Sequence, residues 1–414
     1  MKFVDKRKYD IVVAGGGVAG IAAAVEAARD GKKVVIIDKS TQLGGLATIG
    51  LVNLFVPMCN GRGVQVIRGI CDEMLQLAKK YGYGDFPSDW ENGEPGHNNT
   101  LQRLSLRFSA PIYSLALCEY VRQHGIDVMF DTVVTDINAT GGHIDSIIVF
   151  NKSGHMLYEA DMFVDTTGDA DILNMLGVPT VTQGNYHTYY AFGTTVENCK
   201  TVAETNNMAK LNTSRFGGRA NLHGDNHPEG MPLWDGTNAD SVTDYLITNQ
   251  LELLDNIRDE DRRARDITLL PIMPQFRTTR HIDGNYTMTM EDAYKHHEDS
   301  VGTICDFANK DFLFEVPYGT LVCDGFDNVI TAGRSAAAEG YMWDILRVIP
   351  PAIQTGQAAG AAVCQAIDKG VAITDIDIKA LQAKLEAEDI MVHFDDALLP
   401  EDLNAVDETE LEHI

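Results

Sequence analysis

Residues 9–38 read YDIVVAGGGVAGIAAAVEAARDGKKVVIID, and the fold class is predicted from them. YDIVVA is a short apolar run typical of a buried strand, and VAGIAAAVEAARD carries apolar residues at helical spacing. Gly31 ends the helix, and KKVVIID is a second buried strand. A strand, a glycine-rich turn, a helix and another strand in this order predict an α/β protein that begins with a Rossmann-like unit.

The turn between the first strand and the helix, GGGVAG at 15–20, satisfies the pattern G-x-G-x-x-G. Gly15 permits a tight turn, Gly17 lets the backbone approach a pyrophosphate, and Gly20 lets the helix pack closely on the strand. The positive end of the helix favours phosphate, and Asp38 would accept hydrogen bonds from ribose hydroxyls and repel a 2′-phosphate. An adenine dinucleotide is therefore predicted, and the turn alone leaves FAD and NAD open. The predicted contacts are Gly15, Gly17, Val18, Ala19, Gly20, Asp38 and Lys39.

Composition and charge narrow the class of protein. The 414 residues are 44% hydrophobic and 22% charged, as in an ordinary globular protein, and the length favours two lobes. A net charge of −27 argues against nucleic acid and anionic membranes as partners, because both are bound mainly through Lys and Arg. Seven cysteines without a C-x-x-C pair fit reduced thiols, and without a signal peptide we expect a cytoplasmic protein. No His or Cys spacing matches an established metal site, so no metal is predicted.

Turn signals and strand patterns predict a small antiparallel meander, with strands near 126–137, 143–150 and 156–165. The composition then changes to Asn, Thr, His, Asp and aromatic residues, which indicates an inserted α+β lobe. The predicted organisation is a discontinuous dinucleotide-binding domain at 1–185 and 315–375, an inserted substrate or cap domain at 186–314, and an acidic C-terminal helix and tail at 376–414.

Further segments carry a resemblance to a known family. They are LGGLATIGLV at 43–52, VDTTGDADI at 164–172, RTTRHIDG at 277–284, NVITAGRS at 328–335 and LRVIPPAIQTGQAAGAA at 346–362. With the glycine-rich turn, and in this order, they resemble the bacterial FAD-dependent oxidoreductase family of the glutathione-reductase-like flavoprotein superfamily. The resemblance covers about 1–180 and 270–370, and it implies FAD as the cofactor.

The resemblance also implies where FAD is held. The GG segment at 44–45 would run along the pyrophosphate and flavin, and the strand near Val133 would meet adenine through its backbone. The turn at 167–169 would close over the adenosine half, and the strand end at Gly333 would lead to the pyrophosphate and ribityl chain. The implied contacts are Gly44, Gly45, Leu46, Thr48, Val133, Val134, Thr167, Gly168, Asp169, Gly333, Arg334, Gln354, Gly356 and Gln357.

The last segment carries a prediction of its own. Pro350 and Pro351 stand at or before the first position of an Ala- and Gly-rich helix, whose small residues would let its start lie close to a flat ring. Its dipole would stabilise negative charge on the reduced flavin, and the alternative is an ordinary, tightly packed helix. Related enzymes tether flavin covalently through a His near the GG segment. Residues 40–56 contain no His, so we expect non-covalent FAD.

Candidate catalytic residues gather at Arg277, Arg280 and His281. On a strand, Arg277 and His281 would share one face. Arg277 can clamp a carboxylate, and histidine titrates near neutral pH. An interdomain salt bridge with His281 as a packing residue explains the same sequence equally well. Arg347 is a further candidate for contact with flavin or substrate, with pairing to Asp344 as the alternative.

These observations predict an FAD-dependent oxidoreductase that transfers hydride between a small polar metabolite and the flavin N5, with a second electron acceptor or donor. Two alternatives stay open. One is a flavin-dependent reductase of an activated C=C bond, and the other is an FAD-binding subunit that relays electrons to a protein partner. The sequence is compatible with a homo-oligomer and does not name the substrate.

Overall fold

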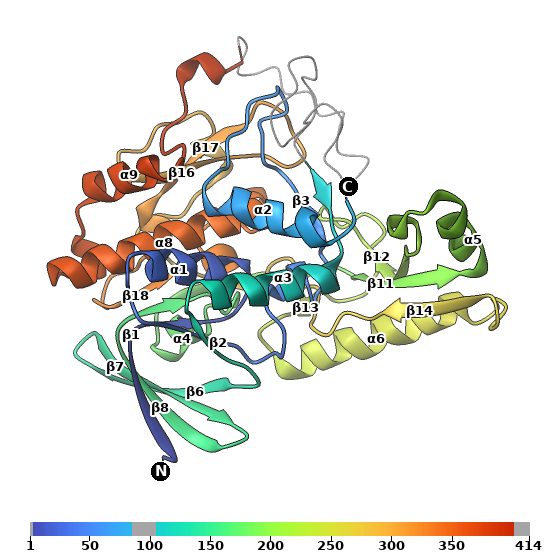
Figure 1. Cartoon of the computed structure of the whole chain (residues 1–414), viewed down its shortest axis with the longest axis horizontal. Coiled ribbons are helices and arrows are strands. Elements are labelled where there is room, and N and C mark those ends of the chain that lie inside the picture. Colours follow the sequence, from blue (N-terminus) through green and yellow to red (C-terminus); the bar gives the residue numbers. More distant parts are fainter. Residues whose placement is uncertain (1–2, 85–104, 401–414) are drawn as a thin grey trace.

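The computed structural model describes residues 3–84 and 105–400. Its largest sheet contains β1 (Asp5–Ala14), β2 (Val34–Ile37), β5 (Asp127–Met129), β6 (Val133–Thr140), β7 (His143–Asn151), β8 (Gly154–Asp165) and β18 (Val329–Thr331). Five of these strands run parallel in the order β5-β2-β1-β8-β18. β1, β2, β8 and β18 are labelled in Figure 1. β7 and β6 extend the sheet from β8 in antiparallel fashion. A Rossmann-like parallel sheet with a small meander is therefore confirmed.

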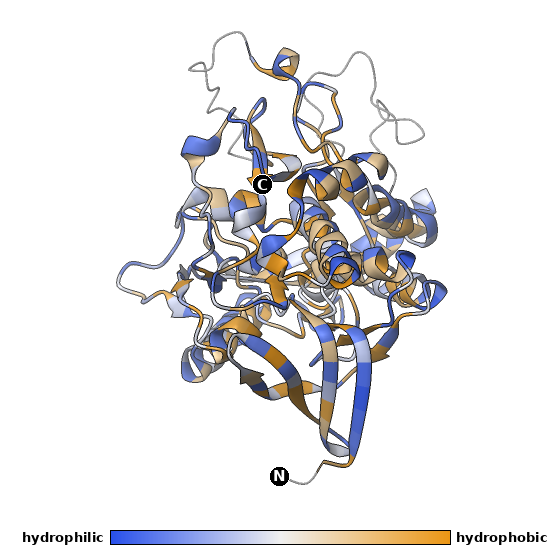
Figure 2. Ribbon diagram, turned by 90° about the vertical axis from the view of Figure 1, so that its left-hand side faces the viewer, coloured by the Kyte–Doolittle hydropathy of each residue, from blue (hydrophilic) through white to orange (hydrophobic). Residues whose placement is uncertain are grey.

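The predicted strand at 126–137 is wrong in one respect, because it is two strands with different partners. β5 runs parallel to β2, whereas β6 pairs antiparallel with β7. Asp131 separates them with a φ of 48°, a value that an extended strand does not adopt. Helix α3 (Ala110–Gln123) therefore belongs to a crossover from β2 to β5, and only β6, β7 and β8 form the meander. Among the long strands near the N-terminus in Figure 2, some carry blue and orange residues in turn, as expected for a sheet with unequal faces.

Two helices rich in small residues pack against each other beside the sheet. They are α1 (Val18–Arg29) and α8 (Ile349–Lys369). A Cβ added at Gly356 would lie 2.2 Å from the carbonyl oxygen of Ala19, and one at Gly360 would lie 2.5 Å from that of Ala23. Glycine is therefore required at both positions for the two backbones to approach this closely. The prolines expected at the start of this helix lie in its first turn, after Ile349.

A hairpin from the middle of the chain joins the main hydrophobic core. β16 (Ser300–Cys305) and β17 (Leu313–Pro317) pair antiparallel. Ile304 and Phe314 are fully buried in the same cluster as the apolar residues of α1, α8 and α2 (Ile70–Tyr81). The hairpin thus packs with the first lobe, although β16 and the start of β17 lie within residues 186–314, which were predicted for the inserted domain.

The rest of the middle forms a second lobe with its own small core. β11 (Thr188–Thr195) lies between β12 (Thr213–Arg219) and β14 (Arg265–Leu269), and α6 (Ala239–Ile257) packs on this sheet. The buried residues of this core are Tyr189, Ala191, Trp234, Tyr245, Leu253 and Phe276. Strands and a helix together give the α+β character expected of this stretch, and the domain boundaries stay predictions.

Short elements complete the described residues. The two-stranded pairs are β3 (Leu54–Phe55) with β4 (Leu106–Arg107), β9 (Thr180–Thr182) with β15 (Arg280–Ile282), and β10 (Gly184–Asn185) with β13 (Trp234–Asp235). The other helices are α4 (Asp171–Met175), α5 (Val196–Thr205), α7 (Tyr341–Leu346) and α9 (Ile378–Ala387). None of the helices in residues 3–84 and 105–400 is both long and apolar enough to cross a membrane. The end of the predicted C-terminal tail, from residue 401, lies outside the described residues.

Candidate cofactor and substrate site

The predicted cofactor residues follow the carboxyl ends of the parallel strands. β1, β2, β8 and β18 are each followed within two positions by one of them: Gly15, Asp38, Thr167 and Gly333. The carboxyl ends of parallel strands meet at one edge of a sheet, and open α/β sheets bind ligands there. The fold therefore brings together residues that are far apart in the sequence.

Two glycines of the first turn are required by the fold itself. Gly15 has a φ of 107°, and a Cβ there would lie 2.2 Å from the carbonyl oxygen of Thr166 at the end of β8. A Cβ on Gly20 would lie 2.0 Å from the carbonyl oxygen of Gly15. These contacts are the tight turn and the close helix–strand packing that the G-x-G-x-x-G pattern predicts.

Gly17 differs from them, because a Cβ there would meet nothing within 4 Å. It is the residue that precedes the first turn of α1, with an ordinary φ of −68°. The GG segment lies directly against it, since the Gly44 N–H donates to the Gly16 carbonyl at 2.8 Å and Gly17 forms a bridge with Gly44. A Cβ on Gly45 would lie 3.2 Å from the Gly17 Cα. The turn and the GG segment thus form an open cradle of backbone at a helix N-terminus, which fits a pyrophosphate.

The end of β2 connects this cradle to the meander. Asp38 accepts a hydrogen bond from the Gly16 N–H at 2.5 Å through one carboxylate oxygen, and from Ser40 through the other. Its carbonyl accepts the Thr132 N–H at 3.1 Å, which places Val133 beside the end of β2. The side chain of Val133 is 48% exposed. An exposed apolar side chain next to this acid fits the adenosine position that the resemblance implies.

Four other predicted contacts have less distinctive surroundings. Thr48 is buried and donates its hydroxyl to the Leu43 carbonyl at 2.6 Å, which closes the GG segment on itself. Leu46 and Val134 are half-buried, and Lys39 is exposed. Their predicted contacts with FAD stay predictions.

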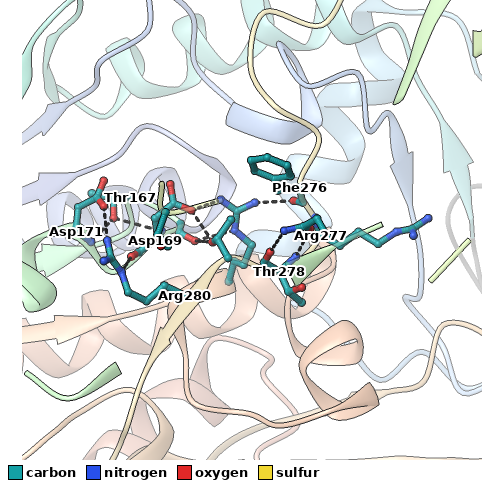
Figure 3. A network of polar contacts seen from close by, with 12 residues as sticks. Thr167, Asp169, Asp171, Phe276, Arg277, Thr278 and Arg280 are labelled. Atoms are coloured by element: carbon teal, nitrogen blue, oxygen red, sulfur yellow. Dashed lines mark hydrogen bonds and ion pairs between the residues drawn. The ribbon is translucent and has the colours of Figure 1, made fainter. Parts of the chain in front are cut away.

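Arg334 holds in place the turn that follows β8, of which Thr167, Asp169 and Asp171 are labelled in Figure 3. Its guanidinium donates to the Gly168 carbonyl, the Phe276 carbonyl and the Asp169 carboxylate, each at 2.7 Å. Arg280 donates to the Asp169 carbonyl at 2.7 Å and pairs with Asp171 at 2.9 Å. Both arginines therefore hold the 167–171 turn against the segment that carries them. For Arg280, these contacts match the salt-bridge alternative and not a substrate clamp.

Asp165, the last residue of β8, lies fully buried beneath this turn. It accepts hydrogen bonds from the Thr167 hydroxyl at 2.8 Å and the Leu173 N–H at 3.1 Å. Burial, and then the charge of Asp171, raise its pKa to about 6. Because the folded state binds this proton more tightly than the unfolded state does, the carboxylate costs stability as pH rises from about 4, its unfolded pKa, to about 6.

Replacement of Asp165 by Asn removes the charge and therefore this pH dependence. We expect the free energy of unfolding of the Asp165→Asn protein, relative to that of the wild type, to increase with pH. The increase should be about 2–3 kcal/mol between roughly pH 4 and pH 7. The measurement is urea unfolding of both proteins without cofactor across this range. A difference in unfolding free energy that stays constant with pH would contradict the assignment.

The start of α8 contacts the cradle through glycine. A Cβ on Gly333 would lie 3.0 Å from that of Ala19, and the Gly333 N–H donates to the Thr355 hydroxyl at 3.1 Å. Gln354 donates to the Thr303 carbonyl at 3.0 Å, while its amide oxygen is buried without a hydrogen-bond partner among the described residues. An unsatisfied buried acceptor near the helix start is compatible with a ligand there.

Gln357 occupies a polar network between helices. Its amide nitrogen donates to Glu388 at 2.9 Å and to Glu26 at 3.2 Å, and its oxygen accepts the Ile70 N–H at 2.9 Å. Both ends of the amide are thus used by protein groups. This arrangement gives no support to the FAD contact predicted for Gln357. Gly356, on the same helix, faces α1 as described above.

Arg277 is a half-buried cation that forms no ion pair with the residues the structure describes, although the charge of Asp344 acts on it from a greater distance. Among the described residues its guanidinium makes no hydrogen bond and no ion pair, and in Figure 3 it extends away from Asp169 and Arg280. Its backbone N–H donates to Asn185 at 2.9 Å. Burial, and then the charge of Arg347, lower its pKa to about 10. Arg347 itself pairs with Asp344, with Nε 2.9 Å from the carboxylate. This is the pairing that the sequence analysis gave as the alternative to contact with flavin or substrate.

Arg277 and Asp344 line a pocket between the second lobe and α7. Its walls include Gly184, Asn185, Tyr186, Gln275, Arg277 and Asp344. Together the charges of Arg277, Arg347 and Asp344 sum to +1. The pocket therefore suits a small anion, because an unpaired charge out of water is unfavourable and an anion would compensate it.

His281 has the contacts of a packing residue. It is 1% exposed, its Nδ1 lies 2.7 Å from the Ile282 carbonyl, and its ring meets Trp343 edge-on at 4.5 Å between centroids. Burial lowers its pKa, so it is neutral near pH 7. The expectation that it shares a strand face with Arg277 is wrong, because the strand spans only 280–282.

No sequence pattern points to Asn185, although this residue organises the region. Its side-chain oxygen accepts the Arg277 N–H, and its nitrogen donates to the Thr278 carbonyl at 2.5 Å. The two segments are more than ninety positions apart. An isolated Asn in a polar stretch carries no pattern that could reveal such a partner.

Comparison with known proteins decides the family. The family described as FAD dependent oxidoreductase matches residues 10–239 and 260–385. The chain belongs to the FAD-dependent oxidoreductase family. As a member, it is an enzyme that uses FAD, and the open cradle at Gly17 fits the pyrophosphate of that cofactor.

Three individual proteins illustrate what this FAD-dependent oxidoreductase is similar to. The soluble pyridine nucleotide transhydrogenase of Marinomonas sp. (strain MWYL1) is 52% identical over 42 residues, which are 10% of this chain and 9% of that protein. The solved structure of p-nitrophenol 4-monooxygenase PnpA from Pseudomonas putida DLL-E4 aligns over 95% of this chain and 91% of its own, with 11% identity and a TM-score of 0.47. A geranylgeranyl bacteriochlorophyll reductase-like protein from Thermoplasma acidophilum aligns over 92% and 83%, with 14% identity and a TM-score of 0.43.

Proposed function

We propose that this FAD-dependent oxidoreductase transfers hydride between FAD and a small polar metabolite with an anionic group, and that Arg277 binds this group. The observation that carries the proposal is the guanidinium of Arg277, which lines the pocket and forms no ion pair with any of the described residues. Bound FAD would supply the hydride acceptor or donor. The protein side chains would bind and orient the metabolite.

Charge balance supports an anionic ligand. Arg347 and Asp344 neutralise each other, so the charge of Arg277 is left over. A carboxylate can accept two parallel hydrogen bonds from a guanidinium, which fixes its orientation as well as its position. The anion would also offset the repulsion between Arg277 and Arg347. Asn185 holds the backbone of Arg277 and would keep the guanidinium at the pocket wall.

Oxidation of a C–H bond and reduction of a C=C bond would use the same anchor, so both directions remain within the proposal. The pocket favours turnover of a small molecule over electron relay to a protein partner, because a relay subunit needs no buried anion site. No side chain is assigned as the acid or base, since His281 is packed against Trp343.

Carboxylates provide the test. We expect the flavin absorbance of the FAD-loaded wild type to shift on titration with small mono- and dicarboxylates, and not with their amides. Arg277→Met should weaken this binding by about 100-fold, since a charge-assisted pair contributes about 2–3 kcal/mol. Arg277→Lys should retain part of it, because a lysine keeps the charge and loses the planar fork.

The control is Arg262→Met, which removes an exposed arginine of the same lobe. It should bind carboxylates as the wild type does. Equal affinity in the Arg277→Met and wild-type proteins, or equal shifts with amides, would refute the anchor.

A further inference from the structure

Two histidines and a buried glutamate converge at a place that the proposed function does not use. Glu315, on β17, is fully buried. His296 Nδ1 lies 2.6 Å from one of its carboxylate oxygens, and His393 Nδ1 lies 2.9 Å from the other. One potential ligand atom from each of the three residues lies within 4.8 Å of the others. The residues come from three separate segments: the loop before β16, the hairpin strand β17 and the chain after α9 (Figure 1).

We propose that His296, Glu315 and His393 bind a divalent transition-metal ion, and that Zn²⁺ is the ion best matched to them. Two imidazole nitrogens and a carboxylate form a ligand set that zinc uses with a fourth position left for water. Mg²⁺ and Ca²⁺ favour oxygen ligands and suit this set poorly. The two histidine side chains are 46% and 36% exposed, so an ion can reach the site from solvent.

The surroundings orient these ligands as metal sites require. The other ring nitrogen of His296, Nε2, lies 2.8 Å from a carboxylate oxygen of Asp396. A ligating histidine commonly donates its second N–H to a carboxylate, which fixes its tautomer and its ring plane. Glu315 is itself held by the His297 N–H at 2.7 Å and the Phe394 N–H at 3.3 Å. The carboxylate is thus fixed in position by backbone donors.

The ion would fasten the C-terminal segment to the hairpin β16–β17. Backbone contacts already join them, since Thr303 donates its N–H to the Met391 carbonyl at 2.6 Å and Ser300 donates its hydroxyl to the Val392 carbonyl at 2.6 Å. The same hairpin contacts α8 through Gln354 and Thr303. None of the three ligands lines the pocket of Arg277. We therefore assign the metal a structural role, separate from hydride transfer.

The test uses the FAD-loaded full chain after dialysis against a chelator. Zn²⁺ is titrated in competition with a chromophoric chelator, and thermal unfolding is recorded with and without Zn²⁺. We expect one Zn²⁺ per chain with a Kd at or below about 1 μM, and a higher Tm in its presence, because the ion binds the folded state only. Mg²⁺ should produce neither effect.

Two single-ligand variants and a control complete the experiment. His393→Gln and His296→Gln should each weaken Zn²⁺ binding by about 100-fold and abolish the rise in Tm, since each removes one of three protein ligands. Both histidines are partly exposed, so these variants should fold. His143→Gln removes another exposed histidine that pairs with a single carboxylate, Asp327, and should bind Zn²⁺ as the wild type does. Absence of stoichiometric binding, or binding unchanged in both ligand variants, would overturn the proposal. Carboxylate binding at Arg277 is measured separately, so failure of either proposal leaves the other intact.

Discussion

The Gly17→Ala protein is expected to fold as the wild type does and to lose most of its affinity for FAD. A Cβ at this position meets nothing within 4 Å, and the φ of −68° is ordinary for alanine. The fold therefore has no need of glycine at this position. A pyrophosphate on the cradle does need it, because the added methyl group would occupy the space through which the ligand approaches the backbone.

We expect Kd for FAD to rise by about 100-fold. This corresponds to about 3 kcal/mol, the cost of a steric clash between the added methyl group and a ligand that cannot move away. The measurement is an equilibrium titration of cofactor-free protein with FAD, followed by flavin absorbance. Circular dichroism and thermal unfolding of the same samples report on the fold. Wild-type affinity for FAD in Gly17→Ala would show that the pyrophosphate lies elsewhere.

Gly20→Ala is the matched control, because it adds the same methyl group three positions later. Its Cβ would lie 2.0 Å from the Gly15 carbonyl oxygen, so the turn must move before any ligand binds. We expect this variant to lose stability as well as FAD. The pair therefore separates a glycine that the ligand requires from one that the fold requires.

The contrast between these glycines also indicates how far sequence reasoning extends. The pattern at 15–20 predicted the strand, the turn and the helix, because a left-handed φ or a close approach is a local demand that glycine satisfies. The same reasoning failed at Asp131, where a non-glycine residue adopts a positive φ and divides the predicted strand. Asp and Asn tolerate this conformation in ways that composition does not reveal.

The sequence alone did not show which residues, distant along the chain, would pair in the fold. Arg277 and Arg280 stand in one motif, yet Arg280 is fully engaged with the 167–171 turn and Arg277 has no counter-ion among the described residues. The chain has 60 Asp and Glu residues, so composition offers every arginine many partners and selects none. The convergence of His296, Glu315 and His393 was hidden for the same reason, since their spacing follows the path of the chain and no local repeat.

The Arg334→Met protein is expected to lose about 3–5 kcal/mol of stability, because breaking a buried ion pair leaves its partner charged and uncompensated. Arg334 and Asp169 have side-chain exposures of 10% and 19%. The substitution removes the guanidinium donors to the Asp169 carboxylate and to the Gly168 and Phe276 carbonyls together. The Thr279 hydroxyl, which donates to the same carboxylate at 2.6 Å, remains but carries no charge. Methionine keeps much of the apolar volume of the arginine stem, so the loss reports on hydrogen bonds and charge.

Three further proteins test that explanation. Arg258→Met removes an ion pair with Asp255 whose members are 67% and 61% exposed, and should cost no more than about 1 kcal/mol. Asp169→Asn in the Arg334→Met background removes the stranded charge and should restore part of the stability, and the single Asp169→Asn protein completes a double-mutant cycle. Unfolding in urea gives all of these free energies. Arg334 joins the turn after β8 to Phe276 of the second lobe, so the Arg334→Met substitution should also weaken FAD binding. This effect would be indirect, because the guanidinium of Arg334 is fully occupied by protein groups. Equal stability losses in Arg334→Met and Arg258→Met would mean that the turn is held by its backbone alone.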